Sequence, residues 1–329
     1  MTPKEIYELG IKLAVKADLR GETEMKKKIK KNIEKYNNLK GQEKEEFDKE
    51  SLLNPYADSR IYGKNLDKPV KKIIAGIDIE EAEVLLANTL GDVDMLIAHH
   101  PHGHGLSGLH EVMDLQAEIL AQEGVPINIA QNLIKKRLAE VGRSVAAANH
   151  FRTIDMANFL NIPFMCAHTF CDNLVARYLT DEIKKKQKKL ETVGEIVEFL
   201  KEIPEYKEAT YRKSGPQIFV GSPDNYTGKI TISEMTGGTN GSKDIYEKMA
   251  QAGIGTVVGM HMSEEWKKEA EKYHINVIIA GHMASDSLGV NLFLDELEKK
   301  GIEVISLGGL IRIKRFKNAG TKRKSSRSK

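Results

Sequence analysis

The 329-residue sequence is poor in several features, and each shortage excludes a class of protein. With only two cysteines, Cys166 and Cys171, it has no disulfide framework, and we expect both thiols to stay reduced in a cytosol. No apolar run approaches the ~20 residues that a membrane-spanning helix needs. The first residues lack the apolar segment of a secretory signal. We therefore expect a cytoplasmic protein without a membrane partner.

The last residues of the sequence include no acidic ones, so the net charge of +3 for the whole sequence differs in sign from that of the preceding residues. Residues 312–329 hold nine of the 50 Lys and Arg residues and no Asp or Glu, so 41 basic and 47 acidic residues remain, a net charge of −6. The composition of residues 316–329 predicts a disordered basic tail. The tail and the lysine-rich run 26–31 could contact nucleic acid. We expect instead that the tail is inert and that the run 26–31 forms the solvated face of a helix. Nucleic acid is therefore not an expected partner.

Histidines, in contrast, are concentrated in one short segment. The stretch Asp94–Gly105 holds four of the ten histidines, His99 and His100 among them. The apolar run before His99 has the length of a buried strand, and Pro101 and the glycines that follow cannot continue it. Open α/β sheets place ligands at the carboxyl ends of strands, and imidazole is the commonest metal ligand. The segment therefore favours a metal site over a polar turn whose histidines face water.

The same pattern recurs in the second half of the chain. Two further apolar runs end in a histidine that an aspartate follows four residues later, namely His168 with Asp172 and His282 with Asp286. Helical spacing continues after each pair, so histidine and carboxylate can point at one place above a sheet edge. Another run ends in His261 without such an aspartate. These repeats predict one shared metal centre.

Six side chains are the predicted ligands: His99, His100, His168, Asp172, His282 and Asp286. Six donors exceed the needs of one tetrahedral zinc, and no thiolate cluster is present. Mixed imidazole and carboxylate ligation fits two divalent transition-metal ions, whether Zn, Fe, Mn, Co or Ni. Such a pair would lower the pKa of a bound water. His261, which lacks a carboxylate partner, is the candidate catalytic residue for proton transfer or substrate contact.

A glycine-rich loop is a candidate ligand-binding element. Gly237 and Gly238 lie between a predicted strand and a predicted helix, where backbone N–H groups can cradle an anion. The spacing of a Walker loop is absent, and an anion pocket and a plain tight turn both stay open. Asp78, at the end of its own strand, could add a carboxylate to the site, but we expect it to cap the next helix.

The order of the predicted elements indicates an α/β protein. Strand 71–78, helix 80–90 and strand 94–99 form a βαβ unit, for which a parallel pair is expected. The second half repeats strand, helix and histidine-ended strand, and it closes with a strand near 304–307. The predicted fold is two similar α/β lobes with mostly parallel sheets facing a central metal cleft, plus an N-terminal helical extension. Five regions are predicted: the extension (1–70), the first lobe (71–180), a helical connection (181–215), the second lobe (216–315) and the tail (316–329).

Four motifs in one order carry a family resemblance. They are Leu-Ile-Ala-His99-His100-Pro, Ala-His168-Thr-Phe-Cys-Asp172, the Gly-Gly pair at 237–238 and Ala-Gly-His282-Met-Ala-Ser-Asp286-x-x-Gly289. Over roughly residues 71–310 this combination resembles the NGG-interacting-factor-three-like family, also called domain of unknown function thirty-four. The resemblance implies a di-metal cleft between two similar lobes and ring-shaped homo-oligomers, often hexamers. Family members are often labelled type-two GTP cyclohydrolase I.

The resemblance places the family's metal ligands on the same six residues. The sixth is usually a glutamate and is Asp286 here, which is one methylene shorter. His102 and His104 stand where the family has hydrophobic residues, so they are candidates for extra ligands or pocket donors.

Two classes of function follow from these observations. The first is a metal-dependent hydrolase of a phosphate-containing or cyclic-amide small molecule. The second is a non-catalytic metal-binding or regulatory protein. An open coordination position and an anion-binding loop would favour the enzyme, and a closed, water-free metal shell would favour the binding protein.

Overall fold

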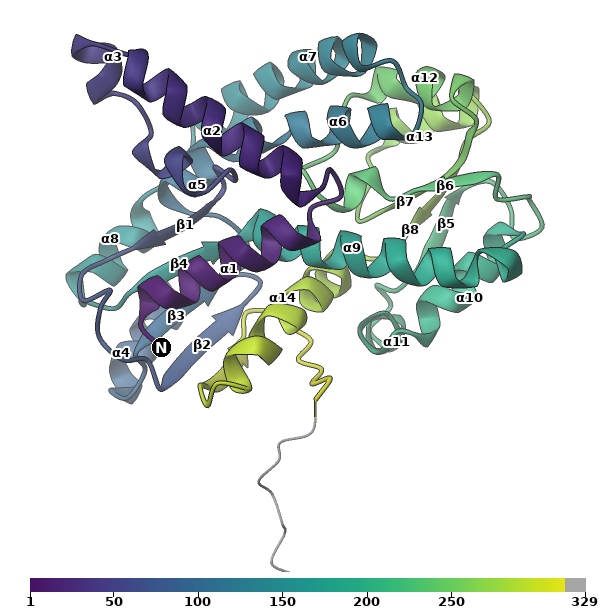
Figure 1. Ribbon diagram of the computed structural model, residues 1–329. Helices are drawn as coiled ribbons and strands as arrows, with labels where there is room; N and C mark the ends of the chain where they lie inside the picture. The colour runs from purple at the N-terminus through teal and green to yellow at the C-terminus, as the bar shows by residue number, and fades with distance from the viewer. Residues whose placement is uncertain (317–329) are drawn as a thin grey trace, which may run out of the picture.

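The computed structural model describes residues 1–316, so the predicted basic tail and its expected disorder fall almost entirely outside the described residues. Two sheets lie beside each other, and helices cover both faces of each (Figure 1). The predicted fold class is confirmed: two α/β lobes with mostly parallel sheets and an N-terminal helical extension. No helix within residues 1–316 is both long and apolar enough to cross a membrane.

The first sheet has five strands in the order β1-β4-β3-β2-β9. They are β1 (Ser59–Tyr62), β2 (Lys72–Gly76), β3 (Met95–Ala98), β4 (Phe164–Ala167) and β9 (Glu303–Leu307). The last four are mutually parallel where they pair, and β1 runs antiparallel to β4 at the edge. Strands β3 and β4 are buried along their whole length, which explains why their sequences are continuous apolar runs rather than alternating ones.

The second sheet has a similar plan with four strands in the order β5-β8-β7-β6. They are β5 (Gln217–Val220), β6 (Lys229–Thr231), β7 (Ile254–Gly259) and β8 (Asn276–Ile279). An antiparallel edge strand, β5, again lies beside the strand that ends before a site histidine, here β8. The predicted repeat of strand, helix and histidine-ended strand is therefore present in the topology.

Helices occupy most of the remaining chain. The extension contains α1 (Pro3–Ala17), α2 (Glu22–Asn38) and α3 (Gly41–Glu45). The following segment contains α4 (Glu81–Leu90), α5 (Gly103–Ser107), α6 (Asp114–Gln122), α7 (Ile127–Ala146), α8 (Arg152–Phe159) and α9 (His168–Lys186). The rest are α10 (Val193–Glu202), α11 (Pro204–Tyr211), α12 (Tyr246–Gln251), α13 (Glu264–Lys272) and α14 (His282–Glu298).

Two strands lie where the sequence analysis did not place them. Strand β1 forms within residues 1–70, which were predicted to be a helical extension, because its backbone pairs with the edge of β4. The final strand, β9, was expected in the second lobe but pairs with β2 of the first sheet, where Val304 and Ile305 lie opposite Ile73 and Ile74. The first sheet thus uses chain segments from outside the predicted first-lobe range of 71–180.

Helices α9 and α14 form a layer that both lobes share. Their side chains contribute to a hydrophobic core on the first sheet and to another on the second sheet. The two helices also pack directly on each other (Figure 1). At their crossing, a Cβ atom on Gly289 would lie 2.2 Å from the carbonyl oxygen of Cys171. Only glycine permits this approach, so the contact fixes how the helices sit.

The N-terminal extension is joined to this layer by a buried polar network. Asp18 is fully buried and accepts hydrogen bonds from Arg20 and Tyr56, both at 2.8 Å. Asn173 on α9 also donates to Asp18, at 3.3 Å, and its own oxygen accepts from Thr236 of the second lobe at 2.8 Å. Burial would raise the pKa of Asp18, but Arg20 lowers it below its ordinary value. The network therefore ties the extension and both lobes together next to Asp172.

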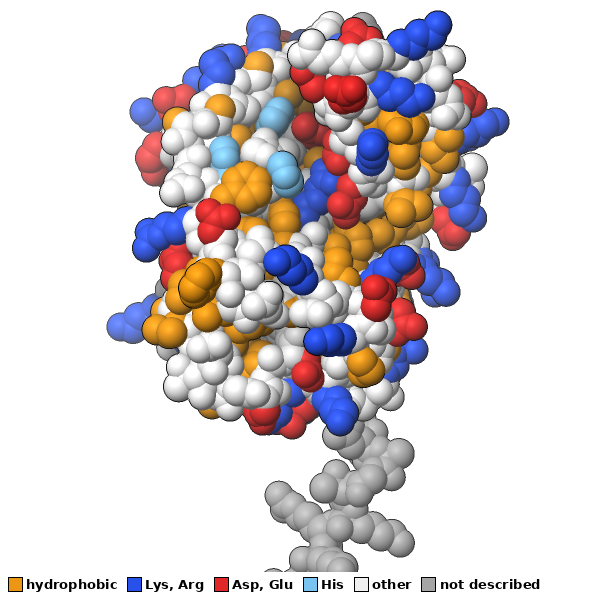
Figure 2. Space-filling model, turned by 90° about the vertical axis from the view of Figure 1, so that its left-hand side faces the viewer, with side chains coloured by type: hydrophobic (Ala, Val, Ile, Leu, Met, Phe, Trp, Pro, Cys, Tyr) orange, Lys and Arg blue, Asp and Glu red, His pale blue; other side chains and the backbone are white. Residues whose placement is uncertain are grey.

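The surface carries mixed charge and a separate cavity. On the face shown in Figure 2, basic and acidic side chains are interspersed, and histidine side chains gather in a hollow.

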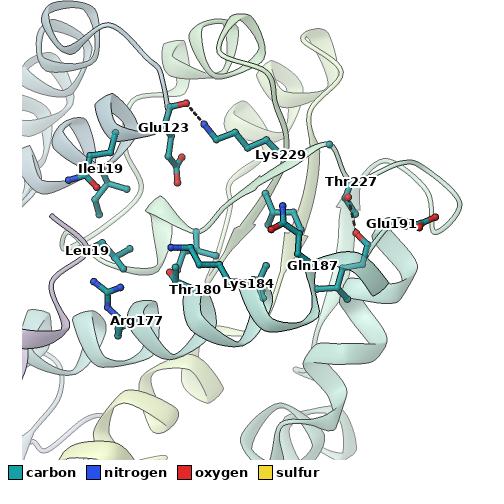
Figure 3. Close-up of a pocket in the computed structure, with 16 residues that line it drawn as sticks. Leu19, Ile119, Glu123, Arg177, Thr180, Lys184, Gln187, Glu191, Thr227 and Lys229 are labelled. Carbon is teal, nitrogen blue, oxygen red and sulfur yellow. Dashed lines mark hydrogen bonds between the residues drawn. The ribbon is translucent and has the colours of Figure 1, made fainter. Parts of the chain in front are cut away.

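A cavity of about 730 Å³ opens between α9, the end of α6 and β6 (Figure 3). Arg177, Lys184, Lys229 and Glu123 are among its polar lining, whereas none of the six predicted ligands borders it.

The crossing of α9 and α14 can be tested by adding one methyl group. Gly289→Ala should lower the free energy of unfolding by about 1–3 kcal/mol, because a backbone oxygen cannot move aside without shifting a helix. Denaturant unfolding measures this difference. Gly142→Ala in α7 is the control: the nearest atoms to its new Cβ belong to the His110 side chain, at 3.2 Å, and not to backbone, so its stability should change by less than about 1 kcal/mol. Equal effects of the two substitutions would contradict the interpretation.

Candidate metal centre

The six predicted ligands come together where strands of both sheets end. His99 and His100 directly follow β3, His168 follows β4, and His282 lies three residues beyond the end of β8. Helices α9 and α14 begin at the last two histidines, so the aspartates four residues later lie on the same helical face. Parallel strands end at one edge of their sheet, which explains why separate segments meet at one point.

Asp286 lies at the centre of the cluster. Its carboxylate oxygens are 3.5 Å from His99 Nε2, 3.5 Å from His100 Nε2 and 3.4 Å from His282 Nε2. Asp172 Oδ1 lies 3.4 Å from His99 Nε2. These separations are longer than ordinary hydrogen bonds. Three groups of ligand atoms, each lying within 4.8 Å of one another, combine residues of the cluster: His99–His100–His168, His100–His282–Asp286 and His99–Asp172–Asp286.

Several polar atoms of the cluster are buried without a hydrogen-bond partner among the described residues. They are both ring nitrogens of His99, Oδ1 of Asp172 and both carboxylate oxygens of Asp286. A buried polar atom left without a partner costs about 1–3 kcal/mol. Imidazole nitrogens and carboxylate oxygens are ligands of divalent transition metals. The cluster therefore fits metal ions and could hold them, whereas the ligand role of each residue stays a prediction.

Two acidic residues outside the cluster orient its histidines. Asp58 Oδ2 lies 2.8 Å from His168 Nδ1, and Asp78 Oδ1 lies 2.6 Å from His100 Nδ1. Each carboxylate favours a proton on Nδ1 and leaves Nε2 as the free nitrogen. This carboxylate–histidine pairing is common behind metal ligands.

The sequence analysis interpreted one of these acids wrongly and missed the other. Asp78 does not cap α4, because Glu80 occupies the cap position and the Asp78 side chain contacts His100 instead. Asp58 is fully buried before β1, within the region predicted to be a helical extension. No local pattern links Asp58 to His168, which lies 110 positions later. Only the pairing of β1 with β4 brings them together.

Burial and charge shift the pKa values of the cluster in opposite directions. Burial raises the pKa of Asp172 to about 6 and lowers the pKa of His282 to about 4. Burial would also lower the pKa of His168, but Asp172 and Asp58 raise it to about 9. Burial opposes ionisation of Asp286, yet His99 and His100 hold its pKa well below the usual range. Burial of ionisable groups at this centre is therefore unfavourable in free energy.

The predicted catalytic residue, His261, lies beside the cluster on the second lobe. It comes two residues after β7, and its ring centroid is 4.8 Å from that of His282. Its Nδ1 lies 2.5 Å from Asn240 Oδ1, which favours a proton on Nδ1 and leaves Nε2 free. Burial lowers the pKa of His261, so its neutral form is favoured at neutral pH.

The buried carboxyl group of Glu234 is linked to His261 through Asn240. Asn240 Nδ2 donates to Glu234 Oε2 at 3.3 Å and to the carbonyl oxygen of His261 at 3.0 Å. Burial raises the pKa of Glu234 to about 7. The sequence analysis assigned no role to Asn240 or Glu234, because neither forms a recognisable motif with His261.

The remaining sequence candidates lie at the margin of the cluster. Gly237 and Gly238 have φ angles of 91° and 84°, and added Cβ atoms would meet Gln116 and the carbonyl oxygen of Leu109. A tight turn packed on Leu109 and Gln116 accounts for both glycines, and anion binding by the loop stays a prediction. His102 lies edge-on to Phe164 and His104 packs against Phe151, and neither belongs to the three groups of ligand atoms.

Comparisons with known proteins found solved structures that are similar to this chain. A NIF3 superfamily protein from Sphaerobacter thermophilus is 31% identical and has a TM-score of 0.71, over 77% of this chain and 92% of that one. Reduced HcgD from Methanocaldococcus jannaschii is 19% identical with a TM-score of 0.43, over 74% and 86% of the two chains. A Bacillus cereus protein related to NIF3 is 12% identical with a TM-score of 0.37, over 79% and 93%. No protein-family model matches the sequence, and no curated protein matches it.

The fold and the cluster define a class of protein: two-lobed α/β proteins with a buried His/Asp site that can hold metal ions. Within that class, the identity and coverage of the Sphaerobacter protein show that this chain belongs to the NIF3 superfamily. NIF3 is the NGG-interacting-factor-three-like family that the sequence motifs indicated, so that family is confirmed.

The orienting role of Asp58 can be tested through metal affinity. Asp58→Asn keeps the size and a hydrogen-bond acceptor but removes the charge behind His168, so affinity for Zn²⁺ should fall about 10–100-fold. Competition with a fluorescent chelator measures the dissociation constant. Asp92→Asn is the control, since Asp92 pairs with Lys72 far from the cluster. An unchanged affinity in Asp58→Asn would contradict this role.

The buried state of Glu234 predicts a pH dependence of stability. Its pKa is raised from 4.5 to about 7 on folding. The stability that Glu234 provides is therefore fully present below pH 4.5 and is lost as the pH rises through about 7. Glu234→Gln does not titrate, so its stability relative to the native protein should rise by about 3 kcal/mol across this window. Urea unfolding at several pH values measures the difference, and a constant difference would refute the prediction.

Proposed function

We propose that this protein is a metal-dependent hydrolase of a small molecule that carries a phosphate or a cyclic amide. The observation that carries the proposal is the set of buried imidazole and carboxylate atoms that have no hydrogen-bond partner within residues 1–316 and that lie beside His261. When bound, two divalent cations would polarise a substrate oxygen and lower the pKa of a water. The small-molecule substrate is part of the proposal, and assembly into a homo-oligomer stays a prediction.

Exposure of the cluster on one side supports an enzyme. The side chains of His282 and His100 are 37% and 27% exposed, whereas that of Asp286 is 1% exposed. The site is thus buried at its base and accessible from one direction, as substrate entry requires.

The residues around the cluster can have different roles in hydrolysis, either accepting a proton or orienting a histidine ring. His261 has a free Nε2, because Asn240 holds the proton on Nδ1, and can accept a proton from a water or a substrate group. Asn240, itself held by Glu234, fixes the orientation of the ring. Asp58 and Asp78 fix the orientation of His168 and His100.

One observation favours the alternative, a metal-binding protein without catalysis. The cavity directly above the cluster, which His168, Asp172, His261 and Asp286 border, has a volume of about 20 Å³. This is room for about one water molecule. A metal-binding or regulatory protein needs no more space, whereas a hydrolase must admit its substrate from the side.

Two substitutions separate metal binding from catalysis. His282→Ala should reduce the metal content measured by ICP-MS below the roughly two ions per chain that paired-metal sites hold. His261→Ala should keep that metal and lower kcat by about 10²–10⁴-fold, measured with p-nitrophenyl phosphate and with dihydrouracil, a cyclic amide.

The outcomes distinguish the two functions. Full metal content in His282→Ala would contradict the shared centre. Metal-loaded native protein that hydrolyses neither class of substrate would favour metal binding without catalysis. Unchanged turnover in His261→Ala would remove this histidine from the chemistry.

A further inference from the structure

A second cavity adjoins the metal centre on the side of the second lobe. It has a volume of about 260 Å³, and Met260, His261 and His282 border both this cavity and the small one above the cluster. A group bound at the metal centre can therefore extend into it directly. For comparison, an engineered protein cavity of about 150 Å³ holds a benzene molecule, so this space admits a ring with substituents.

The lining of this cavity is largely apolar, and its two histidines, His261 and His282, both have lowered pKa values. Phe219, Met260, Met262 and Ile279 supply its apolar surface. Ser214 and Gln217 are the polar side chains beside them, and no Lys, Arg, Asp or Glu among residues 1–316 borders the cavity. Methionine side chains adapt to irregular shapes and make favourable contacts with aromatic rings. The lining suits an uncharged ring or a branched aliphatic group.

A β-bulge places Phe219 at this position. Ile218 pairs with Ile278 and Val220 pairs with Val277, so Phe219 is the extra residue without a partner on β8. Bulges at sheet edges re-aim a side chain and are frequent beside active sites. Phe219 is 36% exposed, although burial of an aromatic side chain is favourable. A ligand in the cavity would cover it.

A glycine forms part of the cavity wall directly before His282. Gly281, which directly precedes His282, has a φ angle of 111°, and an added Cβ atom would lie 2.5 Å from the carbonyl oxygen of Ser214. The segment before β5 therefore lies close against the start of α14. This close contact lies in the wall of the cavity, directly before His282.

We propose that this cavity, bordered by Phe219, Met260, Met262 and Ile279, binds an uncharged aromatic or branched aliphatic substituent of the molecule whose polar group reaches the metal centre. The inference rests on the proposed function and makes it more specific. The substrate combines a hydrolysable polar group with an apolar, ring-sized part, and Phe219 is a specificity-determining residue.

A pair of metal-binding probes tests the cavity separately from the centre. Acetohydroxamate and benzohydroxamate share the chelating group and differ in a methyl or a phenyl substituent. In the full-length protein loaded with Zn²⁺, benzohydroxamate should bind at least about tenfold more tightly, because its ring is removed from water. Isothermal titration calorimetry gives both dissociation constants. Phe219→Ala should reduce the preference to below about threefold.

A matched control and the outcomes make the test decisive. Phe159 on α8 is 84% exposed and does not border the cavity, so Phe159→Ala should keep the full preference. Equal affinity of the two probes in the native protein would overturn the inference and leave the metal centre standing. Failure of both probes to bind would overturn the proposed open metal centre.

A second measurement needs no metal. Benzyl alcohol added to protein with ¹³C-labelled methionine methyl groups should shift the NMR signals of Met260 and Met262, and Phe219→Ala should weaken these shifts. Unshifted signals in the native protein would overturn the inference, whatever happens at the metal centre.

Discussion

Helices α9 and α14 cross so closely that Gly289 lies against the carbonyl oxygen of Cys171. Each helix begins with a histidine of the cluster and carries an aspartate in its next turn. Because the aspartates lie near the crossing, a shift of one helix against the other would move Asp172 relative to Asp286. Protein cores transmit such shifts because they are close-packed. The geometry of the site is thus a consequence of how two backbones meet.

The cluster itself is a poor source of stability. It buries carboxylates and imidazoles whose atoms are too far apart for good hydrogen bonds, and the opposite pKa shifts of Asp172 and Asp286 reflect that conflict. A natural sequence keeps such an arrangement where function requires it, while the surrounding structure provides the stability. The surrounding contacts here are the apolar cores on both sheets and the polar network of Asp18. These surrounding contacts, rather than contacts within the cluster, stabilise the arrangement of the site.

Local sequence patterns predicted the elements that carry the ligands. Apolar runs that end in histidine indicated β3, β4 and β8, and the spacing of His168 to Asp172 and of His282 to Asp286 indicated the first turns of α9 and α14. These features depend on periodicity over a few residues, which a single sequence contains. The topology of parallel strands then predicted that the side chains would converge.

Features that depend on distant contacts were not predictable in this way. Asp58 reaches His168 only because β1 pairs with β4. The cap expected of Asp78 and the contact it makes with His100 are both reasonable for an aspartate at a strand end, and tertiary packing decides between them. The unpaired Phe219 arises from the register between β5 and β8, which the sequence of β5 alone does not determine.

The position of β9 has a consequence for how the protein is made. Strand β2 is synthesised early, but its partner β9 is among the last described segments to leave the ribosome, after the whole second sheet. Until then, the edge of β2 with Ile73 and Ile74 lacks its final neighbour, and unpaired apolar edges are prone to wrong association. His282 and Asp286 also emerge late. The cluster therefore stays incomplete until the start of α14 has been synthesised.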